Sequence, residues 1–131
     1  MKDLLIDHFQ ETVNDLLIRH KSILDVLSKL NEASARVHRA TVKAVTQCGC
    51  LKIDAKKPTI PEDATILQLK EIFDTHLKGE LCPNCKDTIE KEMGRLLFYL
   101  TALCNHLDIN LYDVFIKEQK ALDTLNIFNF T

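Results

Sequence analysis

Four of the five cysteines in this 131-residue chain form two close pairs. One residue separates Cys48 from Cys50, and two residues separate Cys82 from Cys85. Thiolates with this spacing are typical ligands of tetrahedral zinc, where each pair supplies one edge of the tetrahedron. The sequence therefore predicts a structural zinc site with a closed coordination shell, which holds the loop after Cys48 against the segment that begins at Cys82.

Two other interpretations of these cysteines stay open. Cys82-Pro83-Asn84-Cys85 also has the spacing of a thiol redox pair, although the chain lacks the strands of a thioredoxin-type sheet. Alternatively, the four residues are small core side chains or exposed thiols. The metal interpretation is favoured because both pairs have ligand spacing, and because the second pair opens a predicted helix whose dipole stabilises thiolate.

The scarcity of helix breakers predicts an all-α fold. The chain has three Gly and three Pro, and none of these lies within residues 1–48. Apolar side chains recur at intervals of three and four residues, which is typical of helices that bury one face. We predict a single helical domain spanning residues 1–131, a bundle of four to five helices over residues 3–19, 22–47, 62–78, 83–107 and 110–125.

Capping residues mark where these helices begin and end. Ser22 is a candidate N-cap between the first two helices, although one continuous helix to residue 48 is the alternative. A capping box at Thr59–Glu62 and a terminal Gly79 would bound the third helix, and Asn110 would cap the fifth. Leu51-Lys52-Ile53 alternates like a strand but is too short to require a sheet.

The helix over residues 83–107 is the predicted core element, because its apolar residues cover more than one face. Cys104 lies on this apolar stripe and is predicted to be buried. The C-terminal residues 126–131 include Ile127, Phe128 and Phe130, which predicts that they dock on the domain or on a second copy. Apolar residues on several sides of one helix, together with this tail, predict a homodimer.

Composition and charge exclude several classes of protein. The content of 46% hydrophobic and 27% charged residues is ordinary for a soluble globular chain, and no apolar run has membrane-spanning length. The amino terminus does not resemble a signal peptide, so a cytoplasmic location is expected. Residues 35–57 carry six basic side chains against Asp54 alone, but this charge is local and the pI is about 6.2. Nucleic acid is therefore an unfavoured partner.

Two carboxylates are weak candidates for catalytic residues. Glu92 lies on the fourth predicted helix beside apolar residues, and Glu32 lies on a face of the second helix that could meet it. Two inward carboxylates can bind Mg²⁺, but they make a poor site unless a phosphate adds further oxygens. Solvated surface charges are the favoured interpretation.

A resemblance to a known family involves these same residues. Glu92-Met93-Gly94-Arg95-Leu96-Leu97-Phe98-Tyr99-Leu100 and Leu107-Asp108-Ile109-Asn110-Leu111 resemble the third-helix region of MazG-like nucleoside triphosphate pyrophosphohydrolases. Asn31-Glu32-Ala33-Ser34-Ala35-Arg36-Val37 is similar to the acidic helix of that family. The resemblance covers about half of the chain. It implies an all-α, dimeric or tetrameric fold that binds Mg²⁺ through E-x-x-E and E-x-x-D pairs and cleaves nucleotides to the monophosphate and pyrophosphate.

The chain departs from the family pattern at two of the four acidic positions. Ala35 stands where the second Glu of E-x-x-E is expected, and Arg95 stands where the Asp of E-x-x-D is expected. A guanidinium at a Mg²⁺ site repels the ion, and the cysteine-bearing segment between the two motifs is foreign to these enzymes. The resemblance therefore supports the fold of this family better than it supports its enzymatic activity.

Three functions follow from these observations. The first is a zinc-stabilised MazG-like domain that acts as a non-catalytic binding or regulatory module. The second is a Mg²⁺-dependent nucleotide pyrophosphohydrolase that uses Glu32 and Glu92 with compensating acids such as Glu90 or Asp87. In that enzyme, Arg39, Lys43 or Arg95 would bind phosphate. The third is a thiol redox switch.

Overall fold

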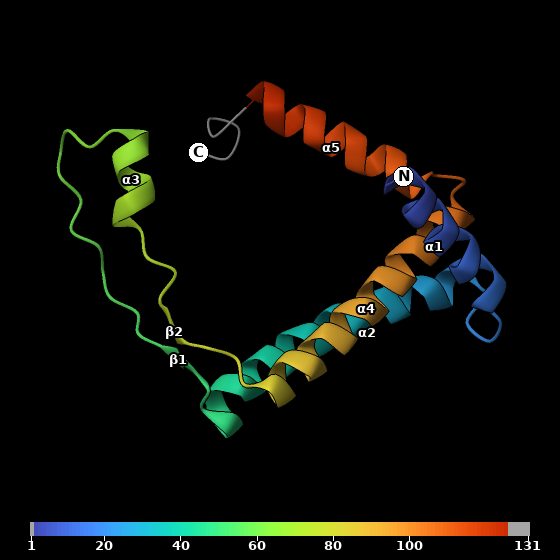
Figure 1. Ribbon diagram of the computed structural model, residues 1–131, viewed down its shortest axis with the longest axis horizontal. Helices are drawn as coiled ribbons and strands as arrows, with labels where there is room; N and C mark the ends of the chain where they lie inside the picture. Colours follow the sequence, from blue (N-terminus) through green and yellow to red (C-terminus); the bar gives the residue numbers. More distant parts are fainter. Residues whose placement is uncertain (1, 126–131) are drawn as a thin grey trace. The chain divides into compact units, whose positions relative to one another are not determined.

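The computed structural model describes residues 2–125, which are mostly helical, as predicted (Figure 1). It contains five α-helices, one π-helical turn and two short strands in that part of the chain. In chain order these are α1 (Lys2–Leu16), α2 (Ile23–Lys43), η1 (Ala44–Cys48), β1 (Leu51–Ile53), α3 (Ile66–Ile72), β2 (Leu77–Gly79), α4 (Pro83–His106) and α5 (Leu111–Leu125). The predicted tail contacts of residues 126–131 lie outside the described residues.

The chain falls into two compact units, and each contributes its own core. Unit 1 comprises residues 1–36 and 92–131, and unit 2 comprises residues 37–91. Because the boundaries fall inside α2 and α4, each unit contains one end of both long helices. The prediction of a single domain over residues 1–131 stays a prediction.

The core of unit 1 joins α1, α2 and α4. Val13 and Val26 are fully buried against Ala102, and Phe98 and Leu103 pack against this cluster. Cys104 is also buried, which confirms the prediction from its place on the apolar stripe. Alanine at the centre lets the helices approach closely, since the side chain adds little volume.

A polar network around Gln10 connects α1 to the turn between α4 and α5. The Gln10 amide nitrogen donates to Asn105 Oδ1 at 2.9 Å and to the Ile109 carbonyl at 2.8 Å, and its oxygen accepts from the Leu111 backbone N–H at 2.8 Å. Asn110 Oδ1 accepts from the Asp113 backbone N–H at 3.0 Å, which confirms Asn110 as the N-cap of α5. The turn between α4 and α5 is therefore held by hydrogen bonds to Gln10 of α1 and by the Asn110 cap at the start of α5.

The first forty-odd residues form two helices, as predicted. The Ser22 hydroxyl accepts a hydrogen bond from the Leu24 backbone N–H at 3.2 Å, so Ser22 caps the start of α2. The His106 ring contacts the Lys21 carbonyl, which connects the end of α4 to the loop before α2. The alternative of one continuous helix to residue 48 is wrong.

The prediction of a helix over residues 62–78 is largely wrong. α3 spans only Ile66–Ile72, and its capping box is formed by Thr65 and Gln68 rather than by residues 59–62. Phe73 turns the chain into an extended conformation, and residues 77–79 then pair with β1 as the antiparallel strand β2. Gly79 therefore lies in a strand rather than after a helix.

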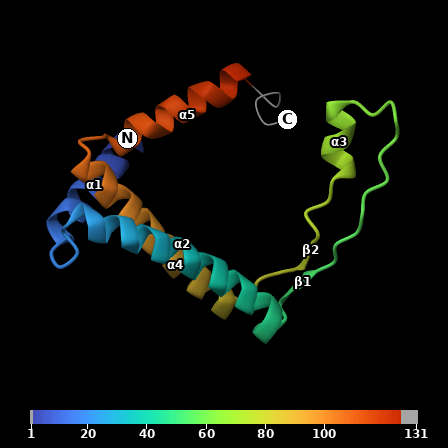
Figure 2. The same ribbon diagram turned by 180° about the vertical axis from the view of Figure 1, so that it is seen from behind.

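The two strands lie next to each other in Figures 1 and 2. Their register places Leu51 opposite Gly79, Lys52 opposite Lys78 and Ile53 opposite Leu77. Leu51 is buried with Ala44 and Ile89 in the core of unit 2, and the other residues of β1 and β2 are exposed. Within residues 2–125, no helix combines the length and the apolar character that crossing a membrane requires.

Candidate metal centre

The four predicted cysteine ligands lie together in unit 2. The sulfur atoms of Cys48, Cys50, Cys82 and Cys85 all lie within 4.8 Å of one another. The Cys48 and Cys82 sulfurs are 3.8 Å apart. A tetrahedral site with metal–sulfur bonds of about 2.3 Å has sulfur–sulfur edges of about 3.8 Å. The cluster thus has the dimensions of a four-thiolate metal site.

The π-helical turn η1 positions the first cysteine pair. The Gly49 backbone N–H donates to the Ala44 carbonyl at 2.9 Å, which closes a wider turn at the end of the helix. Gly49 has φ = 81°, a left-handed conformation that glycine adopts without steric cost. This glycine reverses the chain between Cys48 and Cys50, so that both sulfurs reach the same cluster.

The second cysteine pair forms the first turn of α4. The Cys85 backbone N–H donates to the Cys82 sulfur at 3.4 Å, and the Lys86 backbone N–H donates to the Cys82 carbonyl at 2.9 Å. Cys82 therefore occupies the N-cap position, with its sulfur in the place of the usual capping oxygen. Pro83 fits the first helical position because it has no N–H to satisfy.

The strands and the small core of unit 2 bring the two pairs together. β1 begins directly after Cys50, and Gly79 at the end of β2 lies opposite its first residue, Leu51. Cys50 and Cys85 also pack against the buried residues Ala44, Leu51 and Ile89. The pairing of β1 with β2 and these apolar contacts thus hold the two cysteine pairs close together.

The close packing of the thiols makes their ionisation unequal. The backbone N–H of Cys85 and the Cys85 thiol lower the pKa of Cys82 to about 7. The hydrogen bond from Cys85 to Cys82 raises the pKa of Cys85 to about 12, because Cys85 acts as the proton donor. One thiolate is therefore readily formed, and a cation is required to hold all four as thiolates. Four sulfur donors suit a thiolate-preferring metal and leave no open coordination position.

Binding of Zn²⁺ is expected to strengthen as the pH rises. Between about pH 8 and pH 9, most of Cys82 is ionised because its pKa is about 7, whereas the pKa of Cys85 is about 12. The pKa of Cys48 is also raised overall: the backbone N–H of Cys50 and the Cys85 thiol lower it, but the thiols of Cys82 and Cys50 together with burial outweigh that effect. Zn²⁺ must displace at least these two protons, so its apparent affinity should rise by a factor of about 100 or more per pH unit. Chelator competition at several pH values measures this slope, and a flat profile would contradict thiolate coordination.

Basic side chains lie beside both acidic candidates, Glu32 and Glu92. Glu32 accepts from Lys29 at 3.3 Å and from Arg36 at 3.1 Å. The hydrogen bond from Arg36, followed by that from Lys29, lowers the pKa of the Glu32 carboxyl. Glu92 Oε1 lies 4.0 Å from Arg95, and its Oε2 is buried without a hydrogen-bond partner in the described part of the chain.

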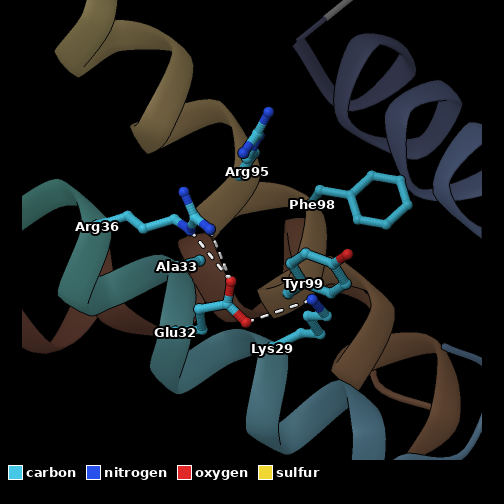
Figure 3. Close-up of a pocket in the computed structure, with 7 residues that line it drawn as sticks. All are labelled: Lys29, Glu32, Ala33, Arg36, Arg95, Phe98 and Tyr99. Atoms are coloured by element: carbon cyan, nitrogen blue, oxygen red, sulfur yellow. Dashed lines mark hydrogen bonds and ion pairs between the residues drawn. The ribbon is translucent and has the colours of Figure 1, made fainter.

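The phosphate candidates divide between the two units. Arg95 lines a pocket in unit 1, whereas Arg39 and Lys43 are exposed on the part of α2 that belongs to unit 2 and do not line that pocket. The residues that line the pocket are drawn in Figure 3. The volume of the pocket is about 180 Å³. Sequence reasoning missed Lys29, Phe98 and Tyr99 as pocket residues. The spacing of Lys29, Glu32 and Arg36 at three and four residues was the available signal.

The four-cysteine cluster is therefore the best-defined candidate site, and the pocket in unit 1 is a second, separate one. No family model matches the chain, and no curated protein or solved structure matches it.

Proposed function

We propose that this protein is a zinc-stabilised, MazG-like helical module that binds or regulates other molecules and does not catalyse a reaction. The observation that carries the proposal is the sulfur geometry: four cysteine sulfurs within 4.8 Å, one pair of them at the 3.8 Å edge of a zinc–thiolate tetrahedron. Zinc is favoured over other ions because four thiolates in tetrahedral positions are its usual structural donor set.

A zinc ion at this site would have a structural role. Its four ligands come from the end of η1, the residue before β1 and the first turn of α4. With all four positions taken by sulfur, no water or substrate can bind the ion, so it cannot act as a Lewis acid. The metal would instead fix the base of the β1–α3–β2 segment to α4.

The surroundings of the acidic candidates support a non-catalytic role. Both oxygens of Glu32 accept charge-assisted hydrogen bonds, from Arg36 and Lys29. A Mg²⁺ ion needs several oxygen ligands, and it would have to displace these cations and approach Arg95. These contacts support only the absence, at Glu32 and Arg95, of the free acidic set on which the enzymes of the resembled family depend.

The experiment combines metal content with a test of activity. Protein purified without chelator should contain about one zinc per chain, and four thiols should become reactive only after chelation. Mg²⁺ and a panel of nucleoside triphosphates should release no pyrophosphate above the rate without protein. Release that Glu92→Gln abolishes would establish the enzyme instead. A metal-free protein with a reversible Cys82–Cys85 disulfide would favour the redox switch.

The module is expected to function as a homodimer. Among the described residues, exposed large apolar side chains outnumber buried ones, and Met93, Leu97 and Leu100 form an exposed stripe along α4. A stripe at helical spacing is the kind of surface that a second copy covers. Light scattering should give twice the chain mass of 15.0 kDa. Leu97→Asp should yield monomers, whereas Ser34→Asp, at an exposed polar position, should not.

A further inference from the structure

The pocket in unit 1 has a chemical character that the metal centre does not explain. α2 contributes Lys29, Glu32 and Arg36, and α4 contributes Arg95, Phe98 and Tyr99. Residues spaced by three and four along a helix share a face, so Lys29, Glu32 and Arg36 are presented together to this cavity. Figure 3 shows the Glu32 carboxylate held between Arg36 and Lys29, with Tyr99 beside Lys29 and with Arg95 and Phe98 extending from the neighbouring helix α4.

Positive charge dominates this pocket. Three basic side chains line it against the single carboxylate of Glu32. Arg36 uses its Nε and Nη2 on one Glu32 oxygen, and Lys29 uses one donor on the other. Arg95 reaches only Glu92, at 4.0 Å, among the described residues. Since an arginine carries five N–H donors and a lysine three, the pocket has donors to spare.

The walls and the size of the pocket limit what it can bind. The Phe98 and Tyr99 rings pack edge to face, with centroids 5.1 Å apart, and add aromatic surface to the lining of the pocket. The volume of about 180 Å³ equals that of about six water molecules, and lies below the range of drug-sized ligands. A tetrahedral oxyanion with a few waters fits this space, whereas a divalent cation would meet mostly positive charge.

We infer that the α2–α4 pocket of unit 1 binds a phosphate-class oxyanion directly, without a metal ion, through the guanidinium groups of Arg36 and Arg95 and the ammonium of Lys29. Charge-assisted hydrogen bonds from guanidinium groups are the strongest contacts that a side chain offers to phosphate. Glu32 orients Lys29 and Arg36 but competes with the anion for their donors. This inference gives the proposed binding module a ligand class, and it is tested apart from zinc because all the residues lie in unit 1.

The test is a calorimetric titration of the full-length protein with inorganic phosphate and, separately, with adenosine monophosphate. The buffer should be low in salt, because salt screens exposed charges. Saturable binding without Mg²⁺ is expected. Equal affinities for both probes would identify a free oxyanion as the ligand. Tighter binding of the monophosphate, reduced by Phe98→Leu, would identify the phosphate end of a larger aromatic molecule.

Variants with opposite expected effects separate binding from folding. Arg95→Gln should weaken binding about tenfold, whereas Glu32→Gln should strengthen it about tenfold by freeing the donors of Lys29 and Arg36. Arg39→Gln removes the same charge from an exposed position on α2 that does not line the pocket, and should change affinity by less than about threefold. Misfolding can only reduce binding, so the increase for Glu32→Gln tests the site itself.

Three outcomes would overturn the inference. The first is no saturable binding of either probe up to about 10 mM. The second is binding that appears only when Mg²⁺ is added, because a metal would then hold the anion. The third is an equal loss in Arg95→Gln and Arg39→Gln, which would indicate general charge attraction. Zinc content is expected to stay unchanged in all of these variants, so failure here leaves the metal centre standing.

Discussion

Cys82→Ser is expected to abolish metal binding and to unfold the hairpin of unit 2. The hydrogen bonds from Cys85 lower the pKa of Cys82 to about 7, and the Cys82 sulfur accepts the Cys85 backbone N–H at the start of α4. Structural zinc supplies much of the folding free energy of small metal domains. We expect a loss of at least about 4 kcal/mol in the free energy of unfolding, which lowers Tm by about 15 °C.

Two measurements check this result. Metal analysis should fall from about one zinc per chain to none, and hydrogen exchange should accelerate in η1, β1 and the first turn of α4. Cys104→Ala is the matched control, because it removes a buried thiol that lies outside the cluster, in unit 1. It should lower stability by about 1–2 kcal/mol and leave the zinc content unchanged. If Cys82→Ser retained zinc and Tm, the four-thiolate site would be wrong.

Gly79→Ala is expected to destabilise the hairpin by about 3 kcal/mol and to weaken zinc binding. Gly79 has φ = 84°, where an L side chain is strained by about 1–2 kcal/mol. A Cβ at this position would also overlap the carbonyl oxygen of Cys50. That oxygen belongs to the backbone and cannot move without shifting Cys50, so overpacking adds a further cost of about 1–3 kcal/mol.

Gly49→Ala is the control that separates strain from overlap. Gly49 has a similar φ of 81°, but a Cβ there would meet no atom within 4 Å. We expect this variant to lose only the strain of about 1–2 kcal/mol and to keep its affinity for zinc. Chemical denaturation with a chelator titration measures both effects. Equal losses for the two variants would show that the overlap with Cys50 has no consequence.

Local sequence signals predicted most of the helices. Ser22 and Asn110 carry side chains that cap backbone N–H groups within a few residues, so their effect does not depend on the rest of the fold. The proximity of the two cysteine pairs was likewise predicted, because ligand spacing is a local pattern and a shared metal requires the pairs to meet.

The errors concern interactions between distant residues. Residues 77–79 continue an apparent helical pattern, but pairing with β1 overrides it, and that pairing spans a long loop that no local signal reveals. One error was local instead: the capping box forms between Thr65 and Gln68, three residues apart, rather than at residues 59–62. The pocket in unit 1 requires α2 to face α4 at the right rotation, which the sequence of either helix leaves undetermined.

The antiparallel hairpin and the cysteine cluster together make a closed ring of chain. Between Cys50 and Cys82 the polypeptide leaves the metal centre and returns to it, and residues 54–63 on the way are exposed and lack regular structure. A protease that cuts within residues 54–63 would therefore divide the covalent chain without separating the two pieces. The nicked protein should run as one species under native conditions, because the core of α1, α2 and α4 in unit 1 and the cysteine cluster both hold the two pieces, and as two fragments once it is denatured.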